Sequence, residues 1–219
     1  MVKEGYILIA SGDKKYFKFA AQAARTIRYF DKERAICLAC DNRNAVDNAD
    51  LRLFDSFADL RNTEILRGTE HHLYMYDLSP FERTMYIDSD CLVASTRIHD
   101  IWSKLLSVSV AFQGNRRVEG EWRRLDIAAI RRKFNLDYVF QLNGGVFYFD
   151  RSAEARSFFG LAQSLFDERH PEITQTHVHG GGRSNEPIWA VAMALSKLPG
   201  MPLSSLWQLS TARLELNRS

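Results

Sequence analysis

Cysteine is scarce in this sequence, and no long apolar run is present. The 219 residues include three cysteines, Cys37, Cys40 and Cys91, which are too few for a disulfide framework. No stretch of about twenty apolar residues could cross a membrane, and no secretory signal pattern occurs. These absences predict a soluble, intracellular protein of the cytoplasm without a transmembrane segment.

The chain also lacks a strong excess of either charge. Its 29 basic and 27 acidic residues give a formal net charge of +2, so long-range attraction to nucleic acid is not expected. The most basic segment, residues 116–133, has a net charge of +4. No aromatic stacking platform accompanies these charges, which disfavours nucleic-acid binding. The segment reads as the solvated face of a helix, and a clamp for a diphosphate or an acidic acceptor is the alternative.

Cys37 and Cys40 form a C-x-x-C pair within the apolar run of residues 35–40. In a strand their side chains face opposite sides, so they cannot converge on one ion. No second cysteine pair or nearby histidine completes a metal site. The pattern therefore predicts two buried thiols.

Short apolar runs alternate with stretches of helical period along the chain. The apolar runs are residues 5–10, 35–40, 51–55, 84–88, 108–114 and 141–150, and the helical stretches are residues 16–30, 98–106, 121–134, 153–169 and 185–198. This alternation predicts an α/β fold. In the first helix, Phe19, Ala23, Ile27 and Phe30 are expected to face the core. No repeat or linker divides the chain, so we expect one domain over residues 1–219.

Small or acidic polar residues follow three of the expected strands. They are Ser11, Gly12 and Asp13 after the first, Asp41 and Asn42 after the second, and Asp88 and Asp90 after the run at 84–88. Ligands of open α/β sheets bind outside the carboxyl ends of strands, so this edge is the candidate site. Each residue taken singly is also ordinary turn chemistry.

Asp88 and Asp90 lie at positions i and i+2 of an extended segment and can converge on one cation. Their oxygens suit Mg²⁺ or Mn²⁺. Such an ion would neutralise charge on a departing nucleoside diphosphate. A solvated turn or a helix cap is the structural alternative.

The segment LSPFERTMYIDSDCLV, residues 78–93, resembles the D-x-D segment of GT-A-fold glycosyltransferases, especially family eight, the glycogenin and galactosyltransferase-like group. Four further segments resemble the same family in matching order: ILIASGDKKYFKFA, AICLACDN, QLNGGVFYFDRS and SNEPIWAVAMA. The resemblance implies a single Rossmann-like nucleotide-diphospho-sugar transferase domain with a mixed, mainly parallel central sheet.

The resemblance also implies an activity, the transfer of a hexose from a nucleotide sugar, in particular a UDP-hexose, to an unidentified acceptor, with Mn²⁺ or Mg²⁺ as cofactor. It places Asp88 and Asp90 on the metal, Ala10, Ser11 and Asp13 at the nucleotide, Ser89 by the ribose, Asn143, Gly144 and Gly145 at the sugar or acceptor, and Asn185 and Glu186 near the reacting sugar. Asn143, Asn185 and Glu186 are thus the expected catalytic residues.

One feature departs from the family pattern. The family commonly supplies a histidine from a C-terminal segment as third metal ligand, and this chain has no histidine after His179. The glycine-rich segment 176–184, with His177 and His179, is a candidate lid that is open without donor and brings an imidazole to the ion. A loop with two histidines is more often an ordinary loop, which is the alternative. Asn185 and Pro187 have the pattern of a helix start, with Asn185 as a possible cap.

Two other functions remain open. The chain could bind a nucleotide sugar without turning it over. It could also be a haloacid-dehalogenase-like phosphatase, in which the first aspartate of D-x-D attacks phosphorus, although that motif usually closes the first strand. A nucleotidyltransferase is disfavoured, because ASGDKK lacks the glycine-rich arginine signature of that group.

Overall fold

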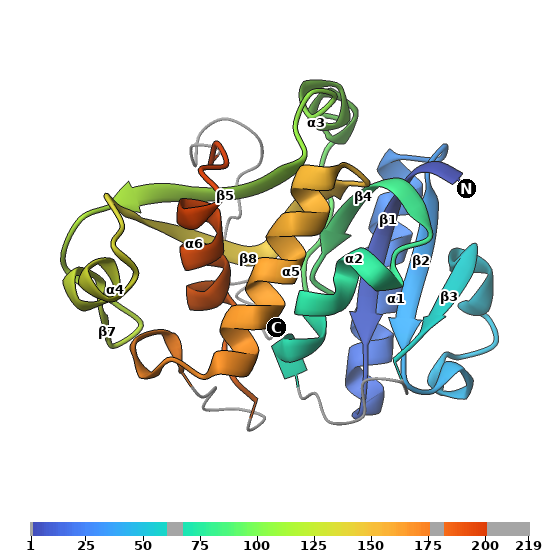
Figure 1. The fold of residues 1–219 in the computed structure, drawn as a ribbon. Helices are drawn as coiled ribbons and strands as arrows, with labels where there is room; N and C mark the ends of the chain where they lie inside the picture. The colour runs from blue at the N-terminus through green and yellow to red at the C-terminus, as the bar shows by residue number, and fades with distance from the viewer. Residues whose placement is uncertain (1, 61–67, 176–181, 201–219) are drawn as a thin grey trace, which may run out of the picture.

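A six-stranded sheet runs through the computed structural model, which describes residues 2–60, 68–175 and 182–200. Its strand order is β3-β2-β1-β4-β8-β5 (Figure 1). The strands are β1 (Val2–Ala10), β2 (Ala35–Cys40), β3 (Ser56–Asp59), β4 (Phe81–Ile87), β5 (Val110–Arg117) and β8 (Val139–Asp150). β1, β2, β3 and β4 pair in parallel, whereas β8 is antiparallel to both β4 and β5. The expected mixed, mainly parallel sheet of an α/β fold is confirmed.

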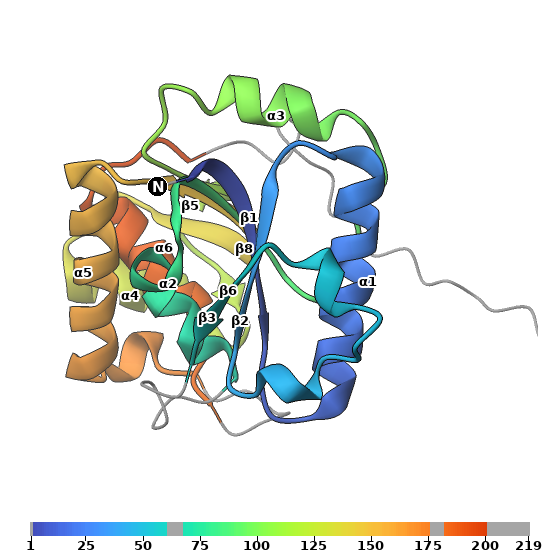
Figure 2. The same ribbon diagram turned by 90° about the vertical axis from the view of Figure 1, so that its right-hand side faces the viewer.

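Helices cover both faces of the sheet. They are α1 (Lys14–Phe30), α2 (Met75–Leu78), α3 (Ile98–Lys104), α4 (Ile127–Phe134), α5 (Ala153–Glu168) and α6 (Glu186–Leu195), with 3₁₀ turns η1 (Arg43–Ala45), η2 (Leu51–Leu53), η4 (Gly68–Tyr74) and η5 (Pro171–Ile173). α1 lies on one face, and α2, α5 and α6 lie on the other (Figure 2). Alternate residues of β1 enter separate cores, because Tyr6 and Leu8 pack on the α1 side and Ile7 packs on the opposite side.

The expected inward stripe of α1 is confirmed for Ala23 and Ile27 but not for Phe19. Its buried residues are Phe17, Ala20, Ala21, Ala23, Ala24 and Ile27. Phe19, expected in the core, has 42% of its surface exposed, and Phe30 is only partly buried. Four of the six inward residues are alanines. The prediction that Phe19 faces the core, which relied on the spacing of large apolar residues, is therefore wrong.

The apolar run at 51–55 is not a strand. Leu51–Leu53 forms the turn η2, and the strand β3 begins at Ser56. Asp55 precedes β3, and its carboxylate accepts a hydrogen bond of 2.7 Å from the backbone N–H of Ile36. The edge strand thus starts after the apolar residues, at a polar contact with β2.

The helix expected over 121–134 begins six residues late. Residues 121–126 form a hairpin of β6 (Glu121–Trp122) and β7 (Leu125–Asp126), and α4 begins at Ile127. Asp126 caps α4 by accepting a hydrogen bond of 2.9 Å from Ala128 N. The two turn residues, Arg123 and Arg124, have φ angles of 52° and 67°, in the left-handed region that glycine and asparagine favour.

The cysteine expectation is confirmed. Cys37 and Cys40 are buried, unbridged and on opposite faces of the sheet, in different cores. Burial raises the pKa of each thiol to about 11, which keeps both protonated at neutral pH. Among the described residues, none of the helices is both long and apolar enough to cross a membrane.

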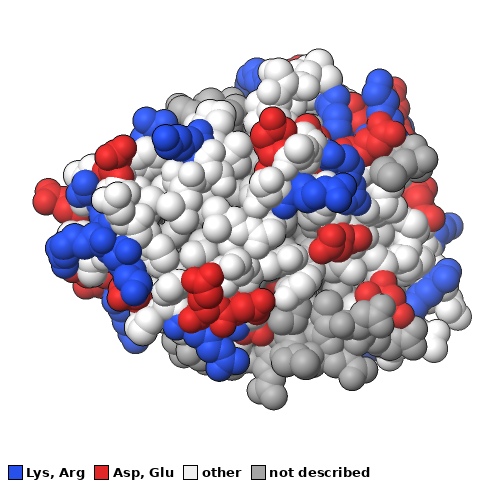
Figure 3. Space-filling model, viewed as in Figure 1, with Lys and Arg blue, Asp and Glu red and all other residues white. Residues whose placement is uncertain are grey.

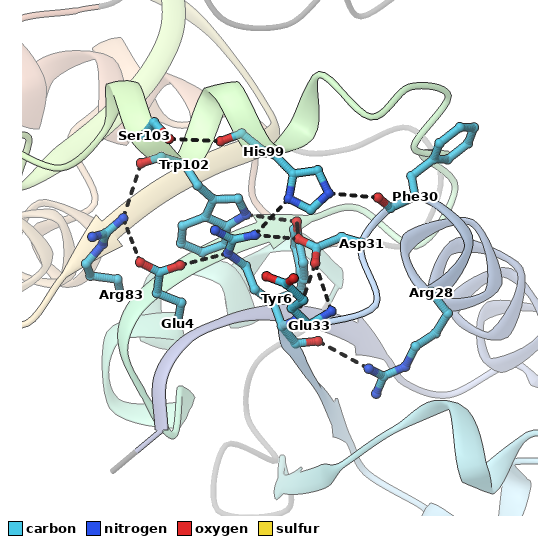
Figure 4. Close-up of polar contacts among 11 residues, drawn as sticks. Glu4, Tyr6, Arg28, Phe30, Asp31, Glu33, Arg83, His99, Trp102 and Ser103 are labelled. Atoms are coloured by element: carbon cyan, nitrogen blue, oxygen red, sulfur yellow. Dashed lines mark hydrogen bonds and ion pairs between the residues drawn. The ribbon is translucent and has the colours of Figure 1, made fainter.

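A buried polar network lies at the amino-terminal edge of β1 and β4 (Figure 4). Asp31 is fully buried and accepts hydrogen bonds of 2.6 Å from the Tyr6 hydroxyl and 2.8 Å from Arg34 Nη1. The Trp102 indole donates to the same hydroxyl at 2.8 Å, and Arg34 also donates to Glu4. Burial alone raises the pKa of Asp31, but the bonds from Tyr6 and Arg34 outweigh it and hold that pKa below its ordinary value. The network joins α1, α3 and β1.

We expect Asp31→Ala to lower the free energy of unfolding by about 3 kcal/mol, because it removes one partner of a buried ion pair. Urea denaturation at pH 7 measures the loss. The matched control is Asp47→Ala, which removes an exposed pair with Lys14 and should change the free energy by less than about 0.5 kcal/mol. Equal losses in the two variants would show that the network does not stabilise the fold.

Candidate functional site

The carboxyl ends of β1, β2 and β4 meet at one edge of the sheet, here called the carboxyl edge. Ala10 pairs with Cys40 at the ends of β1 and β2, and Ile7 pairs with Tyr86 near the end of β4. In Figure 1 the arrowheads of β1 and β2 point down to this edge. Ser89, in the loop after β4, donates a hydrogen bond to the carbonyl of Ile9. That bond ties the aspartate loop to the end of β1.

The residues expected at the nucleotide lie at this edge with their own local roles. Ala10 is buried, and Ser11 is half-buried. Gly12, at φ 74°, donates its N–H to Asp41 Oδ2 at 2.8 Å, which joins the loops after β1 and β2. Asp13 caps α1, and the backbone N–H of Lys15, at 2.9 Å, lowers the pKa of its exposed carboxyl. The start of α1 is thereby fixed beside the ends of both strands.

Asp88 is the most perturbed carboxyl at the carboxyl edge. Its side chain is 35% exposed, and its Oδ1 accepts a hydrogen bond from the hydroxyl of Tyr86. Burial, with smaller contributions from the neighbouring Asp90 and Glu186 carboxylates, raises the pKa of Asp88 to about 7 against the opposing bond from Tyr86. Asp90 is exposed. Negative charge is therefore concentrated at the end of β4, where a cation would relieve it.

A bulge in β8 brings the asparagine-glycine segment to Asp88. Phe147 pairs with Phe112 of β5 and Asn143 pairs with the next residue, Gln113, so residues 144–146 are extra in β8. Within the bulge, the carbonyl of Gly145 accepts the N–H of Asp88 at 2.7 Å.

Both glycines of the bulge allow close approach. A Cβ on Gly144 would lie 2.9 Å from Trp189 Cζ3, and one on Gly145 would lie 3.4 Å from Asp88 Oδ2 and 3.1 Å from Asn143 Oδ1. The backbone of Gly144 donates to Glu186 Oε1 at 3.1 Å. Asp88 and Glu186 therefore approach adjacent residues of the same bulge.

A chain of hydrogen bonds leads from α6 to Asp88. Asn185 Nδ2 donates to the carbonyl of Thr69 and to His72 Nδ1, both at 2.9 Å. Since the carbonyl requires a donor, the amide orientation is fixed and His72 Nδ1 must accept. The proton of neutral His72 is then on Nε2, which donates at 2.9 Å to the Tyr86 hydroxyl, and that hydroxyl donates to Asp88. This chain fixes the rotamer of Asp88.

These hydrogen bonds correct the expectation that the Asn185 side chain caps a helix. Its side chain makes no capping hydrogen bond to α6, although it occupies the N-cap position. His72 and Tyr86 were not predicted. Tyr86 could have been found, because it precedes Asp88 by two residues and shares its face of β4. His72 lies in the turn η4, where no periodic pattern marks a residue as inward.

Glu186 is a buried carboxylate with one cationic neighbour. The residue is 8% exposed, and its Oε2 lies 2.8 Å from Arg123 Nε in the β6–β7 turn. Burial raises the pKa of Glu186, while Arg123 and the Gly144 N–H oppose the rise. Arg123 was expected on a solvated helix face and instead lies against a candidate site residue.

The third metal ligand is not found among the described residues. No group of three or more histidine, cysteine, aspartate or glutamate side chains in ranges 2–60, 68–175 and 182–200 could hold an ion. His177 and His179 lie outside the described residues. The described end of the expected lid is anchored, because Arg183 N donates to Glu70 Oε1 at 2.8 Å. The lid over residues 176–184 stays a prediction.

Comparison with known proteins identifies the fold class. The galactosyltransferase LgtC, solved with donor and acceptor sugar analogs, matches with a TM-score of 0.61 and 14% identity over 90% of this chain and 72% of that chain. An active-site mutant of LgtC matches at 0.60 and 14%, over 95% and 81%. The glycosyltransferase GlyE of Streptococcus pneumoniae TIGR4 matches at 0.54 and 12%, over 92% and 46%. The chain has the GT-A-like fold of these glycosyltransferases.

Sequence comparison adds nothing to the structural likeness. No protein-family model matches the chain, and no curated protein is similar to it in sequence.

The raised pKa of Asp88 predicts a pH-dependent stability. An unfolded aspartate titrates near about 3.9, and the folded carboxyl titrates at about 7, so the folded state holds the proton more tightly. The stability that this proton provides is lost as pH rises through about 7. Asp88→Asn should therefore gain stability relative to the unsubstituted protein between pH 5 and pH 8, measured by urea denaturation without divalent cations. The exposed control Asp137→Asn should show no such trend; parallel curves for both variants would contradict the assignment.

Proposed function

We propose that this protein is a metal-dependent glycosyltransferase that moves a hexose from a nucleotide sugar, a UDP-hexose, to an acceptor. The observation that carries the proposal is the approach of Asp88 to the β8 bulge: a Cβ on Gly145 would lie 3.4 Å from Asp88 Oδ2. The sheet, which is GT-A-like, thus carries Asp88, Asp90, the asparagine-glycine bulge of β8 and Glu186 together. The resemblance of the same segments to family eight supports this reading.

Asp88 and Asp90 are the residues that would hold Mn²⁺ or Mg²⁺. Two hard carboxylate ligands leave positions for diphosphate oxygens and water, an arrangement that Mg²⁺ and Mn²⁺ accept. Burial and the neighbouring carboxylates together raise the pKa of Asp88, and a cation would stabilise its ionised form. Such an ion stabilises the charge on the leaving diphosphate.

Asn143 and Glu186 are the residues that would act on the sugar. Asn143 is exposed, and its Oδ1 accepts the N–H of Gly145 at 2.8 Å, so its amide N–H groups are left for a sugar hydroxyl. Glu186 borders the same bulge through Gly144. Asn185 has both amide hydrogens engaged with Thr69 and His72, so we assign it a positioning role.

A protein that binds a nucleotide sugar without turning it over would use the same residues. A measurement of turnover distinguishes that function from a glycosyltransferase. The phosphatase alternative gains no support from the fold, because Asp88 follows a strand that comes fourth in the chain and the sheet is GT-A-like.

Calorimetric titration with UDP, GDP, ADP, UDP-glucose and UDP-galactose, each with and without Mn²⁺, tests the proposal. We expect UDP compounds to bind in the presence of Mn²⁺, and Asp88→Asn and Asp90→Asn each to weaken that binding at least about tenfold, or about 1.4 kcal/mol. The control Asp137→Asn should bind as the unsubstituted protein does. Equal UDP affinity with and without Mn²⁺ and in both variants would overturn the metal-dependent site.

Asn143→Ala should lower the rate of UDP-hexose hydrolysis more than the affinity for UDP. The lost contact is with the transferred sugar, whereas UDP is held by the metal and the loops after β1 and β4. Steady-state kinetics and calorimetry measure the two effects, and thermal denaturation checks that the bulge still folds. Gln141→Ala, two residues earlier on β8, is the control. A matched loss of UDP affinity and turnover would remove Asn143 from the sugar site.

A further inference from the structure

The β6–β7 turn places two arginines in a backbone conformation that arginine rarely adopts. Arg123 and Arg124 have φ angles of 52° and 67°. The left-handed region costs a residue with a Cβ roughly 1–2 kcal/mol, and two-residue hairpin turns of this kind normally contain asparagine and glycine. Such strain persists where surrounding contacts require it, and it is concentrated at functional sites.

The contacts of Arg123 account for its conformation. Its carbonyl accepts a hydrogen bond from the Gln175 side chain, and the preceding Trp122 is buried with 6% exposure. Its guanidinium lies 2.8 Å from Glu186, and its side chain is 42% exposed. The turn thus inserts one cation beside the first residue of α6. Figure 3 shows the other basic side chains of this end of the molecule at the left of the view, over α4 and β7.

The carboxylate of Glu186 is held asymmetrically. Its Oε1 accepts the N–H of Gly144 at 3.1 Å. Its Oε2 is buried and has no hydrogen-bond partner among the described residues, so the 2.8 Å contact with Arg123 Nε is an ion pair without hydrogen-bond geometry. Oε2 therefore depends on the charge of Arg123 rather than on a hydrogen bond.

Burial and two neighbouring groups decide the charge of Glu186. Burial of Glu186 disfavours its ionised form. The Arg123 guanidinium and the Gly144 N–H favour the ionised form. Without Arg123, this buried carboxyl would take up a proton more readily.

We propose that Arg123 is a positioning residue that keeps Glu186 ionised and fixed against the β8 bulge, so that Glu186 presents a hydrogen-bond acceptor, and not an acid, to the sugar. The role of Glu186 toward a sugar rests on the proposed function. The pairing of Arg123 with Glu186 does not, and it can be tested by itself. Arg124 is the matched comparison, since it is exposed and shares the left-handed turn.

The test of the pairing is the titration of Glu186 by carbon NMR, with glutamate labelled at the carboxyl carbon and the signal assigned by its loss in Glu186→Gln. Arg123→Gln should raise the apparent pKa of Glu186 by at least about one unit, because opposite charges at this range shift a pKa by about one to three units. Arg123→Lys, which keeps the charge, should restore most of the original value. Arg124→Gln should leave the titration unchanged.

The readout for function is hydrolysis of UDP-glucose and UDP-galactose in Mn²⁺. Arg123→Gln should lower kcat at least about tenfold with the KM for the donor changed less than twofold, whereas Arg124→Gln should keep both. An unshifted Glu186 titration in Arg123→Gln, or equal shifts in the two glutamine variants, would overturn the proposal. If no variant hydrolyses a UDP sugar, the proposed function fails and the NMR titration still decides the pairing. Arg123→Asn, which also removes the charge and tolerates the left-handed turn, serves if Arg123→Gln does not fold.

Discussion

The β8 bulge is the constraint on which the candidate site depends. One strand must pair with β4 and β5 at once, and the extra residues 144–146 let the two pairings proceed in different registers. In the bulge, backbone groups that would otherwise pair within the sheet are left for other partners. Asp88 bonds to the carbonyl of Gly145, and Glu186 bonds to the N–H of Gly144. Side chains at Gly144 and Gly145 would collide with or crowd the groups around them. The two carboxylates that we propose for metal and sugar thus share one piece of backbone.

Charge is distributed differently at the two ends of the sheet. At the amino-terminal edge, the buried Asp31 is paired with Arg34 and is held below its ordinary pKa. At the carboxyl edge, Asp88 lies near two other carboxylates and its pKa is raised to about 7. The first arrangement stabilises the folded state, whereas the second leaves negative charge that favours a cation. Stability and the candidate chemistry are therefore separated along the strands.

The residues that position the site come from segments without a sequence pattern of their own. His72 lies in a 3₁₀ turn, and Arg123 lies in a strained two-residue turn. Each acts on a side chain that the resemblance had already indicated, through Tyr86 on Asp88 and directly on Glu186. If these contacts are removed, the residues at the edge remain but lose their orientation or charge, which is why their variants are informative tests.

The sequence by itself determined the α/β class and the strands around Asp88 and Asn143, because the spacing of apolar residues is a local pattern. It also determined that strand ends meet at one edge, because this follows once the strands pair in parallel. It did not determine the face of α1 that carries Phe19, the hairpin before α4 or the start of β3. These features depend on small residues and on polar contacts at the sheet edge, which the spacing of apolar residues does not reveal. Only the tertiary structure decided which groups meet: the registers of β4, β5 and β8 bring Gly145 to Asp88, and a turn far along the chain brings Arg123 to Glu186. These contacts join residues distant in sequence, so no local pattern contains them.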